Sequence, residues 1–352
     1  MPRRSTIHKP RRSILPHPHA ARPATVLNLD AAGLALRELR AGLGRKPREI
    51  PSKYLYDDNG SALFERIMAL PEYFPTRTER ALLLDRAEGI VEAAGGPCLT
   101  DVVELGSGAA SKTVALLDAA LQAGGKPRYV AVDISVHALG RTREILAAAR
   151  PEVPVVEVQA DYTQPFQLPP KPAGGKRLVL FLGGTIGNDE DPTAIELLTR
   201  VRGDLDPGDL LLLGANLVTD PAAIHAAYND AQGVTAAFNK NLLLAVNALA
   251  GSKFDPGNFD HYAPYVVEDR RIEMWLVARG PMEIDLGRIG GGLRLGQGEG
   301  IRTEISRRFV RDDVLRMIDA AGFTPERWMA SPDGRFGLAL GVARRDLRGL
   351  LD

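Results

Sequence analysis

A glycine turn between two carboxylates is the part of this sequence best suited to bind a small molecule. The turn closes the apolar run Val102–Gly108, which carries Glu104, and Asp133 ends the next apolar run. Gly106 and Gly108 let the backbone approach a ligand closely, because they carry no Cβ. A carboxylate at the tip of the second strand can accept hydrogen bonds from both hydroxyls of a ribose. The pattern therefore predicts a nucleoside site at the carboxyl ends of parallel strands.

The residues around this turn favour S-adenosylmethionine over a dinucleotide. A dinucleotide fingerprint has a third glycine and places a pyrophosphate on the helix N-terminus. Here Ser111 occupies the third position, and a charged Glu104 before the turn would repel a pyrophosphate. S-adenosylmethionine has no phosphate, and its sulfonium and ammonium groups tolerate nearby carboxylates. NAD is the weaker alternative. Asp133 could also be only a helix N-cap, a role that Ser135 could fill equally well.

Length and composition indicate an intracellular enzyme. The 352 residues are enough for a large core and for two domains. The 44 basic and 44 acidic residues balance, so nothing global points to nucleic acid. One cysteine, Cys98, excludes an internal disulfide and a multi-thiolate metal site, and no apolar run is long enough to span a bilayer. We therefore expect a cytoplasmic monomer without a metal and without a nucleic-acid or membrane partner.

Strands and helices alternate through the middle of the chain, which predicts an α/β fold with a parallel sheet. After a helix over residues 311–321, two apolar runs surround a Pro-Asp-Gly turn and indicate a terminal hairpin. This is the plan of the Rossmann-like, class I S-adenosylmethionine-dependent methyltransferase sheet. The expected parallel strands are 101–105, 129–133, 155–159, 178–182 and 210–213, and the expected helices between them are 110–122, 136–149 and 194–202.

Two stretches, 28–77 and 217–308, do not fit that sheet. The first looks helical, and the second begins with a helical stretch over 222–250 and ends in alternating strands. We expect them to form one discontinuous α+β domain over the carboxyl ends of the parallel strands, where such sheets bind ligands. The glycine-rich residues 290–300 are expected to be a hairpin turn, since no helix follows them. Residues 78–216 and 309–352 then form the methyltransferase domain, and 1–27 a disordered basic tail.

Six blocks in the sequence resemble the histidine Nα-methyltransferases of ergothioneine biosynthesis. The resemblance runs from about residue 30 to residue 343, in order and without large gaps. It implies three successive methyl transfers from S-adenosylmethionine to the α-amine of L-histidine, which give hercynine and release S-adenosylhomocysteine. The blocks are KYLYDDNGS (53–61), LPEYFPTRTE (70–79), FLGGTIGN (181–188), GVTAAFN (233–239), IEMWL (272–276) and RTEIS (302–306).

For the methyl donor, the resemblance implies roles for residues at the ends of three successive strands. Asp161 follows the third strand, where an acid can meet the adenine amino group, and the ring of Tyr162 can lie along the base. The family more often has phenylalanine after that aspartate, and tyrosine keeps the ring. From the sequence alone, Lys112 could equally be a solvated lysine in a first helical turn. The implied donor residues are Gly106, Lys112, Asp133, Asp161 and Tyr162.

For the amino acid, the resemblance implies an amide, several phenols and an acid–hydroxyl pair. The amide of Asn188 can accept from an α-ammonium and donate to a carboxylate. Glu304 and Ser306 alternate on one strand, so they share a face and can hold an imidazole; Glu273 should point the other way. Without the resemblance, these would be turn, core or exposed strand residues. The implied substrate residues are Tyr56, Tyr73, Gly183, Asn188, Tyr228, Met274, Glu304 and Ser306, with Asn188 and Tyr73 also catalytic.

Two other functions fit parts of this pattern. A related S-adenosylmethionine-dependent enzyme could methylate another amine, such as a tryptophan derivative, but it would lack the acid–hydroxyl pair formed by Glu304 and Ser306. A nucleoside-binding or dehydrogenase module would have no reason to keep Asn188, Tyr73 and Tyr228 together. The residues alone do not identify a general base for the transfer.

Deleting residues 1–27 should change neither the melting temperature nor the turnover. This segment is rich in arginine and proline and poor in apolar residues, so it cannot bury enough surface to order itself. The measurement is a thermal melt and a methyl-transfer assay of the truncated protein beside the full chain. A loss of turnover in the truncated protein would show that this tail contributes to the active site.

Overall fold

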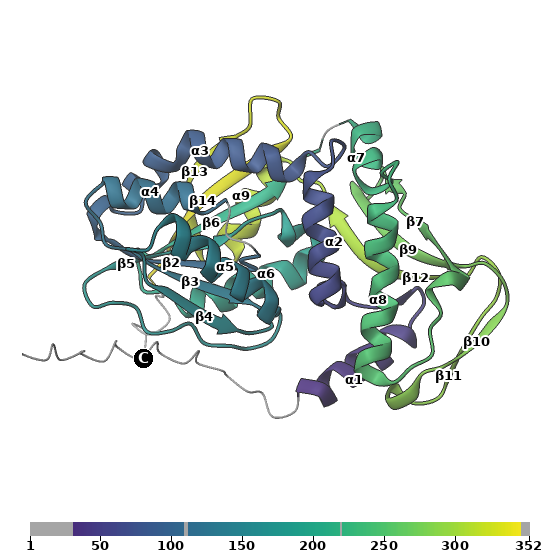
Figure 1. Cartoon of the computed structure of the whole chain (residues 1–352). Helices are drawn as coiled ribbons and strands as arrows, with labels where there is room; N and C mark the ends of the chain where they lie inside the picture. Colours follow the sequence, from purple (N-terminus) through teal and green to yellow (C-terminus); the bar gives the residue numbers. More distant parts are fainter. Residues whose placement is uncertain (1–30, 109–111, 219, 346–352) are drawn as a thin grey trace, which may run out of the picture.

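Two lobes with separate hydrophobic cores make up the chain in the computed structural model (Figure 1). The structure describes residues 31–108, 112–218 and 220–345. The expected tail over 1–27, Ser111 and the ends of the expected domains at 28–30 and 346–352 lie outside the described residues.

A seven-stranded sheet forms the first lobe, in the order β13-β14-β6-β5-β2-β3-β4. The five strands from β6 to β4 pair in parallel, whereas β14 pairs antiparallel with both β6 and β13. This confirms the predicted class I methyltransferase sheet and its terminal hairpin. The strands are β2 (Leu99–Leu105), β3 (Arg128–Asp133), β4 (Val155–Gln159), β5 (Lys176–Phe181), β6 (Leu210–Asn216), β13 (Phe323–Ala330) and β14 (Phe336–Ala343).

Helices cover both faces of this sheet, because its central strands are apolar on both sides. The core on one face includes side chains from α3 (Pro75–Ala93), α4 (Val114–Gln122) and α5 (Val136–Ala149). The core on the other face includes side chains from α6 (Asp191–Gly203) and α9 (Arg311–Ala320). The sequence pattern alone did not predict α3 as a single helix of 19 residues.

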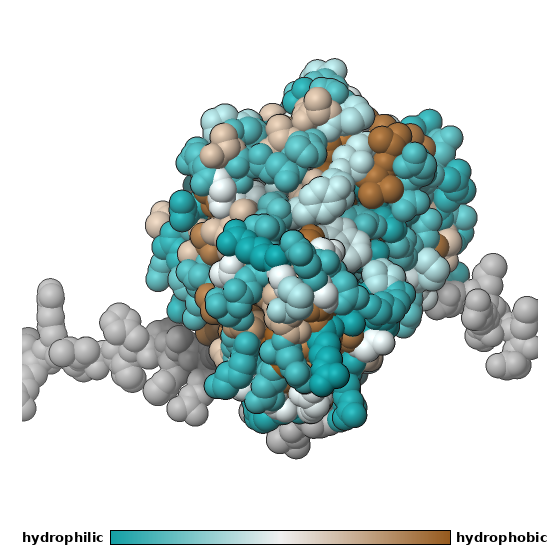
Figure 2. Space-filling view, turned by 90° about the vertical axis from the view of Figure 1, so that its right-hand side faces the viewer, coloured by the Kyte–Doolittle hydropathy of each residue, from teal (hydrophilic) through white to brown (hydrophobic). Residues whose placement is uncertain are grey.

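The second lobe combines a segment that precedes the first lobe in the sequence with a segment inserted between β6 and α9. Its sheet has the order β1-β12-β9-β7, with β8 beside β9, and a two-stranded sheet pairs β10 with β11. The surface that this lobe presents in Figure 2 is mostly hydrophilic, with a few small apolar areas. Its elements are α1 (Ala31–Leu43), β1 (Arg48–Glu49), η1 (Ser52–Leu55), α2 (Asp58–Ala69), α7 (Pro221–Tyr228), α8 (Val234–Ala250), η4 (Pro256–Asn258), β7 (Phe259–Tyr262), β8 (Tyr265–Val266), β9 (Arg271–Ala278), β10 (Met282–Asp285), η5 (Gly287–Ile289), β11 (Gly292–Leu295) and β12 (Gly300–Arg307).

Two local expectations for this lobe were wrong in detail. Residues 290–300 are not only a turn, because Gly292–Leu295 form β11 and pair with β10. The helical stretch over 222–250 is two helices, since α7 ends at Tyr228 and α8 starts only after Gly233, which has a left-handed backbone. Glycine adopts this conformation at little steric cost, so it allows the chain to turn between the two helices. Among the described helices, none is both long and apolar enough to cross a membrane.

Truncating Leu211 to alanine should lower the free energy of unfolding by about 2–5 kcal/mol, because it leaves a cavity in a close-packed core. Leu211 is fully buried in β6, in the middle of the larger sheet. The matched control is Leu244→Ala on α8, whose side chain is 50% exposed and should cost within about 0.5 kcal/mol. Urea unfolding of both variants measures the difference; equal losses would contradict the placement of Leu211 in this core.

Candidate functional site

The glycine turn after β2 has the open backbone that close approach of a ligand requires. Gly106 and Gly108 have positive φ angles of 68° and 50°, a region that favours glycine. The ring of Tyr162 faces the turn, since a Cβ built on Gly106 would lie 3.6 Å from its Cε1. A Cβ on Gly108 would have nothing within 4 Å. The turn therefore leaves room beside an aromatic ring.

Asp133 is fixed at the tip of β3 by the backbone. Its carboxylate accepts hydrogen bonds from the amides of Gly108 (3.1 Å) and Ser135 (2.9 Å). Burial raises the pKa of Asp133, and these backbone hydrogen bonds oppose the shift. The cap of α5 is Ser135, whose hydroxyl accepts from the amide of Ala138. Because a carboxylate has about four acceptor positions, Asp133 can still accept from ribose hydroxyls, and it is not needed as a cap.

Glu104, two residues before Gly106, is buried, and its carboxyl group is less negatively charged than the sequence alone predicted. It is 2% exposed, accepts a hydrogen bond from the Thr113 hydroxyl at 2.5 Å, and also accepts from the Tyr129 phenol. Burial raises the pKa of Glu104 to about 7, against these hydrogen bonds. Glu104 therefore carries less than a full charge at neutral pH, which weakens the repulsion of a pyrophosphate as a reason to exclude NAD.

Asp161 connects the two lobes through Lys53, a residue of the KYLYDDNGS block whose role the sequence did not indicate. One oxygen of Asp161 accepts from the amide and hydroxyl of Thr163, at 2.9 and 2.5 Å. The other accepts from the Lys53 ammonium at 2.8 Å. Lys53 also pairs with Glu38 at 2.8 Å. Beside it, Tyr162 packs edge-on against Phe181, with ring centroids 5.5 Å apart.

Glu79 is a buried acid that the sequence pattern did not predict, and it joins Lys112 to Gly183. Its side chain is fully buried in α3. One carboxylate oxygen accepts from the Gly183 amide at 2.6 Å, and the other pairs with the Lys112 ammonium. Gly214 leaves room for Glu79, since a Cβ there would lie 2.7 Å from Oε1. The available signal was a glutamate at the end of the block LPEYFPTRTE, just before an apolar stretch.

The loop that carries Asn188 starts with two left-handed glycines. Gly183 and Gly184 have φ angles of 78° and 69°, and a Cβ on Gly184 would clash with the Asn216 side chain at 2.2 Å. The short helix η3 (Thr185–Asn188) follows and leaves Asn188 half-buried at its end. Next to it, burial raises the pKa of Asp189 to about 6, so this acid, which the sequence did not single out, titrates near neutral pH.

Five aromatic rings from α2, α7, α8 and the segments around them form one cluster. Neighbouring ring centroids lie 5.5 to 6.4 Å apart. Burial raises the pKa values of Tyr56 and Tyr73 well above the usual range for tyrosine, and Glu304 raises both further. These two phenols therefore keep their protons at neutral pH. The rings are those of Tyr56, Phe64, Tyr73, Tyr228 and Phe238.

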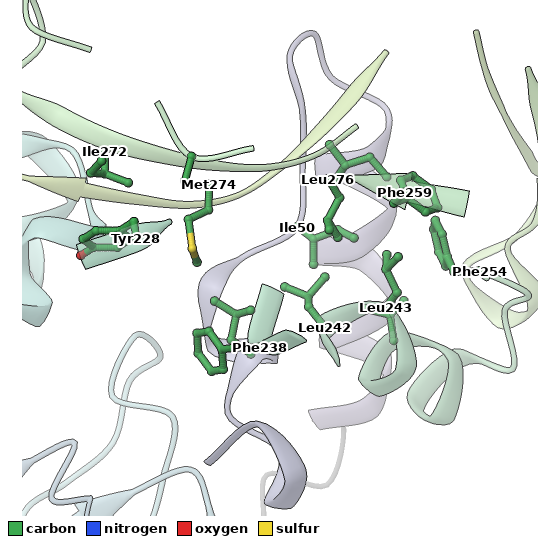
Figure 3. Packing of buried hydrophobic residues seen from close by; sticks show 14 of the residues in the cluster. Ile50, Tyr228, Phe238, Leu242, Leu243, Phe254, Phe259, Ile272, Met274 and Leu276 are labelled. Atoms are coloured by element: carbon green, nitrogen blue, oxygen red, sulfur yellow. The ribbon is translucent and has the colours of Figure 1, made fainter. Parts of the chain in front are cut away.

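A β-bulge in β12 turns Glu304 and Ser306 onto the inner face of the smaller sheet. Opposite β9, Arg302 pairs with Trp275 and Glu304 with Met274, so Thr303 is the extra residue. The Thr303 hydroxyl donates to Asn239 of α8 at 2.5 Å. Figure 3 shows Met274 extending from β9 toward Phe238, with Tyr228 to one side.

Glu304 is a buried acid beside a buried cation. Burial raises the pKa of Glu304 to about 8, and nearby Arg308 partly opposes this. Within the described part of the chain, the Glu304 carboxylate makes no hydrogen bond. Arg308, which the sequence pattern did not indicate, donates to the Ser306 hydroxyl at 2.9 Å, and the Tyr228 phenol donates to the same oxygen at 2.8 Å. The structure thus joins two of the predicted substrate residues, Ser306 and Tyr228, through one network.

Glu273 points to the opposite face, as predicted. Its carboxylate accepts from Arg271 at 2.8 Å and from the Trp275 indole at 3.0 Å, and Arg302 lies 3.5 Å away. These contacts hold it in an outer ion-pair network. Across residues 31–108, 112–218 and 220–345, no group of three His, Cys, Asp or Glu side chains could hold a metal ion.

Comparisons with known proteins identify the family of this chain. The family model described as "Histidine-specific methyltransferase, SAM-dependent" matches residues 35–343. The chain is 40% identical to a histidine N-alpha-methyltransferase of Mycolicibacterium smegmatis, over 91% of this chain and 98% of that protein. It is 32% identical to ergothioneine biosynthesis protein 1 of Neurospora crassa, over 63% of this chain and 26% of that protein. A 4-dimethylallyltryptophan N-methyltransferase of Penicillium roqueforti is 24% identical, over 82% of this chain and 87% of that protein.

Asp133→Ala should weaken the binding of S-adenosylhomocysteine roughly tenfold to a hundredfold, since a hydrogen bond to a charged group is worth about 1.5–3 kcal/mol. Calorimetric titration measures the dissociation constant, and circular dichroism checks the fold. The control is Asp85→Ala on α3, whose carboxylate side chain is 66% exposed and pairs only with its neighbour Arg86 within the described residues. If Asp133→Ala binds as tightly as the parent, the role of Asp133 is structural.

Proposed function

Because the chain belongs to the S-adenosylmethionine-dependent, histidine-specific methyltransferase family, we infer that it transfers methyl groups to the α-amine of L-histidine. It carries out three transfers and makes hercynine, an early step of ergothioneine biosynthesis, with S-adenosylhomocysteine released each time. The observation that carries this proposal is the buried group formed by Glu304, Ser306 and Met274. It lies on one face of the smaller sheet near Tyr56 of the aromatic cluster, and Tyr56 in turn lies near Tyr162.

The residues around the glycine turn fit S-adenosylmethionine. Gly106 and Gly108 would lie against the donor, Asp133 would accept from its ribose, and Asp161 with Tyr162 would hold its adenine. Asp161 keeps a lone pair beside the one that Lys53 uses. When bound, S-adenosylmethionine supplies a methyl group that its sulfonium already activates. The protein therefore has to position the amine in line with that methyl group rather than activate it chemically.

The amino-acid end of the substrate is assigned to Tyr73, Gly183, Asn188 and Tyr228. The Glu79–Lys112 pair fixes Gly183, and the loop that begins there places Asn188. We propose that Asn188 and Tyr73 orient the α-amine and the carboxylate. A phenol that keeps its proton can donate to a carboxylate without adding a charge, which suits the raised pKa of Tyr73.

The imidazole is assigned to Glu304 and Ser306, with Tyr56 and Met274 beside it. A buried acceptor discriminates strongly, because a substrate that leaves it unpaired loses binding energy. An indole has one N–H and no bare nitrogen, so a tryptophan derivative cannot pair with both Glu304 and Ser306 as an imidazole can, and the alternative substrate is not favoured. The faces of Tyr56 and Phe64 can stabilise the growing trimethylammonium group through cation–π contacts.

These roles divide the chain into two functional parts. We propose that residues 28–77 and 217–308 form the substrate-binding domain, and that 78–216 and 309–352 form the donor-binding domain. The Lys53–Asp161 pair links them across the site. We further propose that the enzyme acts as a cytoplasmic monomer, without a nucleic-acid or membrane partner. The equal numbers of basic and acidic residues support the absence of a nucleic-acid partner, since the chain has no excess of positive charge that would attract a polyanion.

Glu304→Leu combined with Met274→Val should depress histidine turnover strongly and raise the relative activity on tryptophan. The first change removes the buried acceptor, and the second enlarges the space beside it. The parent should prefer histidine over tryptophan by roughly 10⁴-fold or more. A competition assay with equal histidine and tryptophan, labelled methyl donor and products separated by mass measures the preference.

The control for this experiment is Glu273→Leu, which removes a glutamate from the opposite face of the same sheet. It should keep the parent's preference for histidine. Asn188→Ala and Tyr228→Phe should lower turnover of both amino acids, because these residues hold the end that all amino acids share. If the double variant retains the preference of the parent, Glu304 is not the imidazole ligand.

A further inference from the structure

Arg308 is a buried cation directly behind the residues assigned to the imidazole. It is 2% exposed and follows β12. Its Nη1 donates to the Ser306 hydroxyl at 2.9 Å and to the carbonyls of Ser306 and Arg307 at 3.2 and 3.1 Å. Its Nη2 lies 3.5 Å from the Tyr228 hydroxyl, and its guanidinium lies 5.6 Å from the centre of the Tyr228 ring. These contacts hold Arg308 in place beside Ser306 and Tyr228, two of the residues assigned to the substrate.

These contacts determine the direction of the hydrogen bonds at Ser306. A guanidinium can only donate, and a hydroxyl oxygen has two lone pairs and one proton. Arg308 donates to the Ser306 oxygen, and in the contact between the two hydroxyls the Tyr228 phenol donates as well, because a phenol is more acidic than an aliphatic hydroxyl. The two lone pairs of Ser306 are therefore used. The remaining group at Ser306 is its own O–H, which can only donate.

Glu304 offers the complementary group on the same face. A carboxylate accepts hydrogen bonds, and the positive charge of Arg308 favours that form. The other ionisable groups that face Glu304 are the phenols of Tyr56 and Tyr73, and Tyr228 faces Tyr73. With Glu304 ionised, the site therefore presents one acceptor and one donor. A neutral imidazole has one N–H and one bare nitrogen, whereas an imidazolium has two N–H groups and no acceptor.

We propose that Arg308 is a positioning residue that fixes Ser306 as a hydrogen-bond donor, so that the site binds imidazole as the neutral ring. The ring N–H then donates to Glu304, and the bare nitrogen accepts from Ser306. This inference rests on the proposed function, because it takes histidine or its methylated forms as the ligand. An imidazolium is rejected, since its second N–H would meet an oxygen whose lone pairs are both used.

Proton release on binding follows from this arrangement. With a pKa of about 8, Glu304 is mostly protonated at pH 7 before a ligand binds. Binding a neutral imidazole through the carboxylate must then release about one proton. The affinity should consequently fall roughly tenfold for each pH unit as the pH drops below 8. If Glu304 instead kept its proton and donated it to the imidazole, binding would release no proton. The affinity would then be the same from about pH 8 to about pH 6.5.

Hercynine isolates this effect, because its trimethylammonium group carries no proton and does not titrate. The protein is saturated with S-adenosylhomocysteine and titrated with hercynine by calorimetry at pH 7, in buffers of different ionisation enthalpy. The parent should release about one proton. Arg308→Met returns a lone pair to Ser306, so it should release close to none and lose the pH dependence. Arg308→Lys keeps a donor and should behave like the parent, as should the surface control Arg316→Met.

The outcomes separate this inference from the function on which it rests. If the parent with S-adenosylhomocysteine binds neither histidine nor hercynine, both fail. If the parent binds hercynine but Arg308→Met releases as many protons as the parent, only the role of Arg308 is overturned. If Arg308→Met does not fold, Ser306→Ala decides, because Arg308 acts through that hydroxyl. Unchanged proton release in Ser306→Ala would overturn the proposal, and a loss of release would support it.

Discussion

The buried carboxylate of Glu79 is the interaction on which the geometry of the site depends. It connects its own helix α3 with two other segments: the residues just before α4, through Lys112, and the loop after β5, through the Gly183 amide. A fully buried charge needs its partners, since removing one leaves an uncompensated charge at a cost of about 3–5 kcal/mol. The carboxylate also requires a residue without a side chain at Gly214. Through these contacts one buried carboxylate joins the loop that carries Asn188, a proposed substrate residue, to the segment that follows the glycine turn after β2.

The polar groups of the proposed site come from both lobes, and other residues hold each of them in place by hydrogen bonds. Asn239 supports the bulge at Thr303 and also donates to the Trp275 carbonyl at 3.0 Å. Asp133 is held by two amides, and Asp161 by Thr163 and Lys53. Such supporting contacts restrict the rotamers of the groups that would touch a ligand. Accurate placement matters here, because the chemistry depends on the alignment of an amine with an already activated methyl group.

Burial shifts the protonation of the site toward neutral groups. The acids Glu104, Asp189 and Glu304 have pKa values of about 7, 6 and 8, respectively, because each is taken out of water. Burial also keeps the phenols of Tyr56 and Tyr73 protonated. These three acids can therefore change charge near neutral pH. Arg308 is the buried cation among these groups and biases Glu304 toward its charged form.

The sequence by itself determined the sheet and its ligand-binding end, because apolar runs, glycine turns and strand-end acids such as Asp133 are local patterns. It also determined the family, since the matching blocks are long and unusual in composition. Only the tertiary structure decided how the site is supported. Glu79 with Lys112, Lys53 with Asp161, and Arg308 with Tyr228 are contacts between residues far apart in the chain. The hydrophobic periodicity of a strand or helix does not predict contacts between residues so far apart in the sequence. The bulge at Thr303 is the clearest case: simple alternation cannot place both Ile301 and Glu304 on the inner face, and the extra residue does.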